Sequence, residues 1–166
     1  LGANPMARAA VDEVGRRAQR RRFRESAAAP AWARLDAAAT TLADLDGPLA
    51  EQVSDAMREA ATGERSLRDL AGRVLTVERA QRFAAPDTQQ SLVEARTMLL
   101  ARLEDGVTTF ERLVAAAAAC AAEHGAVADD LSSVRLADAA DQMAAFAQGL
   151  AELRDLASPT SNAPAS

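Results

Sequence analysis

Two apolar ladders, separated by a proline, constrain the fold of this chain more than any other feature. In both ladders, apolar or small residues recur in alternating steps of three and four, which keeps one stripe on one side of a helix. The first ladder comprises Leu49, Val53, Ala56, Ala60, Gly63, Leu67, Leu70, Val74, Val77, Gln81 and Ala84. The second comprises Leu92, Arg96, Leu99, Leu103, Gly106, Phe110, Leu113, Ala117, Cys120 and His124. Because Pro86 lies between them, the sequence predicts a long antiparallel helical hairpin whose stripes face each other.

The composition favours an all-α fold with a single core. Alanine, the best helix former, occupies 43 of the 166 positions, and most prolines and glycines lie between the patterned segments. Both ladders continue through a glycine, Gly63 in the first and Gly106 in the second, so we expect unbroken helices there. The two glycines either make room for Phe110 or form a hinge or a docking notch.

The pattern divides the chain into three parts. Residues 1–29 form an Arg-rich N-terminal arm with weak patterning, residues 30–157 a helical bundle, and residues 158–166 a disordered tail. Within the bundle we expect helices over about 31–46, 49–84, 88–124 and 132–157. The first helix should cover the second only to about residue 64. The open half of the hairpin is then a four-helix bundle, and the tip, about 67–99, a two-helix coiled coil.

Charge is concentrated in the N-terminal arm. Residues 1–25 carry a net charge of +4, whereas the rest of the chain carries −9. Six arginines are candidates for binding an anionic surface: Arg16, Arg17, Arg20, Arg21, Arg22 and Arg24. They could contact anionic lipid, they could pair with nucleic-acid phosphates while Phe23 stacks on a base, or they could form a solvated tail. The acidic body disfavours nucleic acid elsewhere on the chain.

The hairpin tip is the second candidate site. A two-helix tip exposes apolar flanks, and exposed apolar patches mark contacts. The residues that we assign to this partner-binding surface are Leu75, Arg79, Phe83 and Val93. The same surface could instead serve self-association, or the N-terminal arm could curl over it.

The sequence offers no convincing catalytic or metal site. Cys120 and His124 are four residues apart on one helical face, a spacing that suits two metal ligands, but further ligands are missing. As a nucleophile and base, the pair lacks an orienting carboxylate. We therefore expect Cys120 to be a buried core residue, and the protein to be a non-enzyme without cofactor or metal. A single cysteine also excludes an internal disulfide.

Two stretches carry a family resemblance. They are Leu67-Arg-Asp-Leu-Ala-Gly-Arg-Val-Leu-Thr-Val-Glu-Arg-Ala80 and Leu103-Glu-Asp-Gly-Val-Thr-Thr-Phe-Glu-Arg-Leu-Val-Ala-Ala-Ala-Ala118. Over roughly residues 30–125, the chain resembles the actinobacterial phage-shock envelope-stress membrane proteins (phage shock protein M-like). The resemblance implies a membrane-associated partner of the coiled-coil phage shock protein A. The longest apolar run, residues 113–122, is about half a membrane span, so a spanning segment would have to precede Leu1.

These observations predict a non-enzymatic helical interaction module that binds a coiled-coil, phage shock protein A-like partner. We expect it at the cytoplasmic side of the membrane, or in the cytoplasm, in an envelope-stress response. An anionic membrane surface and a second copy of the chain are further possible partners. The alternative is a cytosolic protein whose N-terminal arm binds nucleic acid.

Overall fold

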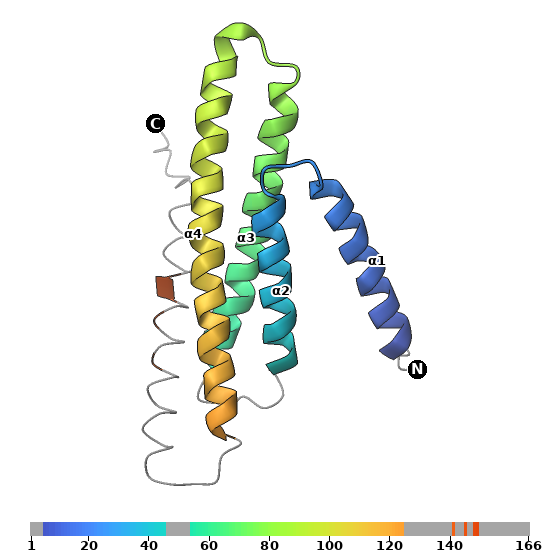
Figure 1. Cartoon of the computed structure of the whole chain (residues 1–166), viewed down its shortest axis with the longest axis vertical. Helices are drawn as coiled ribbons and strands as arrows, with labels where there is room; N and C mark the ends of the chain where they lie inside the picture. The colour runs from blue at the N-terminus through green and yellow to red at the C-terminus, as the bar shows by residue number, and fades with distance from the viewer. Residues whose placement is uncertain (1–4, 46–53, 125–140, 142–144, 146–147, 150–166) are drawn as a thin grey trace, which may run out of the picture.

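The chain forms an all-α structure with one long hairpin at its centre (Figure 1). A computed structural model describes residues 5–45, 54–124, 141, 145 and 148–149. Its helices are α1 (Pro5–Phe23), α2 (Ala29–Leu45), α3 (Ser54–Gln81) and α4 (Pro86–His124). The residues in these ranges contain no strand. The predicted all-α class and helical hairpin are confirmed.

The seam between α3 and α4 is built from the two predicted ladders. Leu103, Phe110 and Leu113 of α4 are fully buried, and Val74 of α3 is fully buried against them in the same core. Gly63 and Gly106 are buried inside unbroken helices, as predicted. Toward the tip the seam opens: Val77, Gln81, Leu92, Arg96 and Leu99 are only half-buried.

Helix α2 packs along the open half of the hairpin, parallel to α4 and antiparallel to α3 (Figure 1). Its buried side chains include Trp32, Leu35 and Leu42. Ion pairs from Arg34 of α2 to α4 add to this packing. The Arg34 guanidinium donates to both oxygens of Glu111, at 3.0 and 2.6 Å, and to Glu104 Oε2 at 2.7 Å. A forked guanidinium–carboxylate pair of this kind fixes orientation as well as distance.

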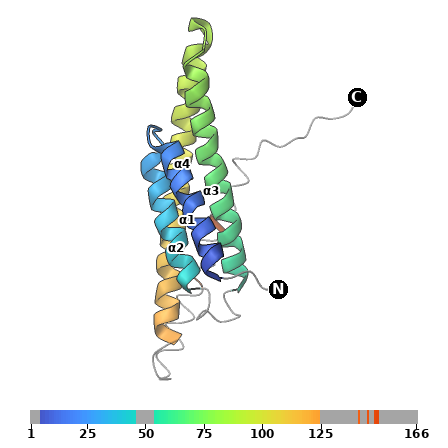
Figure 2. The ribbon, with the colours of Figure 1, turned by 90° about the vertical axis from the view of Figure 1, so that its right-hand side faces the viewer.

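Helix α1 lies over α2 and α3 on one side of the hairpin (Figure 2). The N-terminal arm has weak apolar periodicity, so the sequence did not predict a helix there. Its last turn packs on α2 through an aromatic pair, in which Phe23 and Trp32 stack with ring centroids 4.3 Å apart. The turn that follows lies against α3, where the Ala27 backbone N–H donates to Glu78 Oε1 at 2.9 Å.

The α2–α3 register differs from the prediction. Asp36 pairs with Arg68, and residue 27 reaches residue 78, so α2 and the turn before it extend well beyond residue 64. The part of the tip left bare by α1 and α2 is therefore shorter than predicted.

Two predictions fall largely or wholly outside the described residues. They are the helix over about 132–157, of which only residues 141, 145 and 148–149 are described as helical, and the tail over 158–166.

Across the described helices, no segment combines the length and the apolar character that a membrane crossing requires.

Candidate anion-binding surface and hairpin tip

Three of the six candidate arginines have acidic partners. Arg16 and Arg17 both bind Glu13, at 2.9 and 3.0 Å, within α1. Hydrogen bonds from Arg16 and then Arg17 lower the pKa of the Glu13 carboxyl below its ordinary value. Arg20 reaches from α1 to Asp36 of α2, with Nη2 3.1 Å from Oδ2.

Asp36 is a buried carboxylate that connects three helices. It is 6% exposed, and its second oxygen lies 3.4 Å from Arg68 Nη2 of α3. Arg68 also binds Glu64 at 2.8 Å, and its guanidinium carbon lies 4.8 Å from the centre of the Trp32 ring. Arg20 and Arg68 together compensate the buried charge, which would be costly alone.

The other three candidate arginines lie beside arginines from α3. Arg21, Arg22 and Arg24 are exposed, and within the described part of the chain none of them has a carboxylate partner in ion-pair distance. They line a hollow of about 230 Å³, which we call the basic hollow. Its lining residues are Arg21, Arg22, Arg24, Glu25, Ser26, Leu75, Glu78, Arg79 and Arg82. The fold thus joins Arg79, which we had assigned to the tip, to the arginines of the N-terminal arm.

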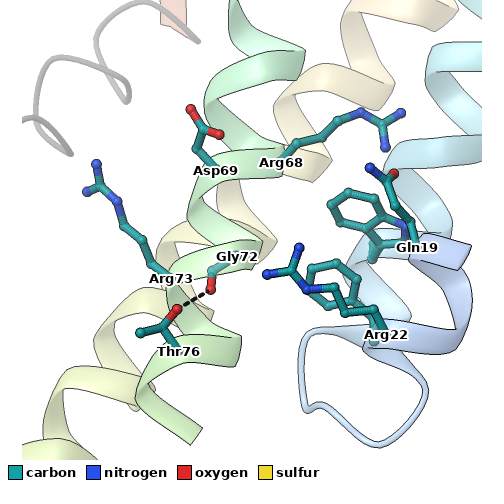
Figure 3. A pocket seen from close by; sticks show the side chains of 9 residues that line it. Gln19, Arg22, Arg68, Asp69, Gly72, Arg73 and Thr76 are labelled. Carbon is teal, nitrogen blue, oxygen red and sulfur yellow. Dashed lines mark hydrogen bonds between the residues drawn. The ribbon is translucent and has the colours of Figure 1, made fainter. Parts of the chain in front are cut away.

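Arg22 also lines a second hollow, of about 490 Å³, which lies beneath α1 (Figure 3). Figure 3 shows its side chain extending from α1 toward α3, near Gly72. Phe23 and Trp32 form part of the wall of this hollow. Phe23 is only 3% exposed and its ring already stacks on Trp32. The prediction that this ring could stack on a base is therefore wrong.

The tip carries exposed apolar side chains, but not all of those predicted. Phe83 is 88% exposed and Val93 is 37% exposed; Met98, which the sequence analysis did not single out, is 52% exposed. Leu75 is buried at 8%, so its predicted exposure is wrong. The reason is that the turn after α1 folds onto this part of α3 and shares the basic hollow with Leu75.

Cys120 is a core residue, as predicted. It is 1% exposed, and burial raises the pKa of its thiol above the ordinary value. Among the described residues, no three histidine, cysteine or acidic side chains are close enough to hold a metal ion together.

Sequence reasoning missed Arg82 and Asp36. Arg82 follows Arg79 by three residues just before the proline turn, and this spacing could have been noticed. The proximity of Arg82 to the N-terminal arm could not have been predicted, because the arm has no apolar periodicity that indicates where it packs. Asp36 reads as an ordinary polar position on an alanine-rich helix.

Comparison with known proteins places the chain in a family. The Rv2743c family matches residues 5–153, which include all four described helices. The chain belongs to the Rv2743c family. No curated protein and no solved structure matches it. In this member of the Rv2743c family, the matched span contains both the basic hollow and the tip.

Proposed function

We propose that this Rv2743c-family protein is a non-enzymatic helical adaptor that binds a second helical protein through the hairpin tip. The observation that carries the proposal is Phe83, which is 88% exposed at the end of the hairpin. A large aromatic side chain that is left in water has no role in the protein's own core, and aromatic side chains dominate the energy of protein interfaces. A coiled-coil partner suits the tip, because a helix pair offers a groove for the apolar stripe of another helix.

The family resemblance supports a more specific version of this proposal. In it, the partner is a coiled-coil protein of the phage shock protein A type, and the adaptor acts at the cytoplasmic side of the membrane in an envelope-stress response. The arginines of α1 would contact the anionic membrane surface, to which each contributes about 1 kcal/mol.

The nucleic-acid alternative has weaker support. Phe23, the one aromatic residue among the arginines of α1, is stacked on Trp32 and is not free to bind a base. Salt-dependent binding of DNA or RNA that is lost on deleting residues 1–25 would favour this alternative.

The partner proposal is tested by co-purification of a phage shock protein A-like protein with the full chain. Replacing Phe83 and Val93 with Ser should weaken the complex by at least about tenfold, since removing an interface anchor costs more than about 1 kcal/mol. Val14→Ser is the matched control, because Val14 is 68% exposed on α1, away from the tip. Normal capture by the tip variant would place the contact elsewhere. Sedimentation of the free variant shows whether the tip instead serves self-association.

A further inference from the structure

The basic hollow brings together arginines from two segments that lie more than fifty residues apart. Arg21, Arg22 and Arg24 come from the end of α1 and the turn after it, and Arg79 and Arg82 from the end of α3 and the turn after it. Neither segment alone encloses a space. The hydrogen bond from the Ala27 backbone N–H to Glu78 fixes the turn that brings the two segments together.

The charge of the hollow is not balanced by its surroundings. Its lining contains five arginines and two glutamates, and one oxygen of Glu78 already accepts the Ala27 N–H. The C-terminal ends of α1 and α3 add about half a negative charge each. Five positive charges therefore face about three negative ones, and the remainder suits a ligand with about two negative charges.

Arginine also determines which anion fits. A guanidinium presents a planar fork of donors that matches phosphate oxygens, and several forks around one space can hold one phosphate from different sides. The hollow, of about 230 Å³, has room for a phosphate group and the carbon chain to which it is attached.

We propose that the basic hollow is a binding site for a phosphate group, formed jointly by α1 and α3. The phosphate would belong to a lipid headgroup or to a small molecule free in solution. The inference deepens the proposed membrane contact and rests on it, but it assigns that contact to a composite site that includes Arg79 and Arg82, rather than to the charge of the arm alone.

The test uses the full chain and vesicles of phosphatidylcholine with or without phosphatidic acid at neutral pH. Replacing Arg79 and Arg82 with Ala should lower the affinity for phosphatidic acid vesicles by roughly thirtyfold, at about 1 kcal/mol for each arginine. The matched control replaces Arg65 and Arg112, which are exposed and lie outside the hollow lining, and so removes the same charge. We expect the control to change the affinity by less than about threefold, since distant charges are screened. Replacing Arg79 and Arg82 with Lys should restore part of the affinity.

Pyrophosphate, titrated against the protein alone, distinguishes the two sources of phosphate. Saturable binding that Arg79→Ala/Arg82→Ala removes would assign the site to a soluble phosphate compound; binding to vesicles only would assign it to a lipid headgroup. Equal losses in the hollow variant and in its control would overturn the composite site, as would no loss in the hollow variant. If either of these results were found and replacing Arg21, Arg22 and Arg24 nevertheless abolished vesicle binding, the proposed membrane contact would be supported and only the composite site would be wrong. Circular dichroism checks that the variants keep their helices.

Discussion

Phe23 and Trp32 stack almost parallel, with an interplanar angle of 14°, and this contact fixes the end of α1 on the beginning of α2. Both rings are nearly fully buried, although residues 14–22, which precede Phe23 in α1, are exposed. The aromatic pair therefore sets where the arginines on either side of Phe23 lie relative to the bundle.

Replacing Phe23 with Ala should release α1. Removing a buried phenylalanine costs about 3 kcal/mol, which is large for a helix with so few other contacts. Trp32 is the only tryptophan in the chain, so its fluorescence reports the change directly. We expect a red shift of its emission and faster proteolysis within α1. Phe83→Ala, which removes an exposed ring, should do neither; an unchanged spectrum in Phe23→Ala would show that another contact holds α1.

The Arg34–Glu111 pair should make stability depend on pH in the acid range. The hydrogen bond from Arg34 lowers the pKa of Glu111 below its ordinary value of 4.5. A lowered carboxyl pKa stabilises the fold above pH 4.5, and this contribution is lost as the pH falls through the folded-state pKa. Both partners are over a third exposed, so we expect at most about 1 kcal/mol.

Denaturant unfolding of Glu111→Gln at neutral and at acid pH measures this contribution. The variant should be less stable than the parent at neutral pH, and the difference should shrink at acid pH. Asp105→Asn, an exposed change on the same helix, serves as the control. A difference that grows as the pH falls would contradict the assignment.

Gly72→Ala should stabilise the protein. Gly72 lies inside α3, and a Cβ built there has no atom within 4 Å, because it faces the hollow beneath α1. Alanine in a helix interior is favoured over glycine by about 1 kcal/mol. For a chain of this size, that corresponds to a rise in Tm of about 2–4 °C. A lower Tm in thermal unfolding would mean that α1 comes closer to this position in solution.

Cys120 should react slowly with a thiol reagent in the native protein. Burial both blocks access and raises the pKa of the thiol, which disfavours the reactive thiolate. The rate should rise to that of a free thiol in denaturant. Rapid labelling without denaturant would show that the seam opens around residue 120.

The sequence predicted the hairpin well because the ladders are a local, repeated pattern that one helix can satisfy only by facing another. It did not predict α1, which is held by the Phe23–Trp32 stack and the Arg20–Asp36 ion pair rather than by a periodic apolar stripe. The error at Leu75 has the same origin, since burial there depends on a turn whose position no local pattern specifies. The charge of the candidate site was therefore predictable, whereas its shape was not.

A peptide of residues 1–25 would carry the charge of the N-terminal arm without the shape of the basic hollow. The peptide would lack Arg79 and Arg82, which line one side of the basic hollow. The distances between its own arginines would also not be fixed by contacts with the bundle. The arrangement of these arginines is therefore a property of the assembled bundle, and replacing Trp32, on which Phe23 stacks, would disturb that arrangement without changing any charge.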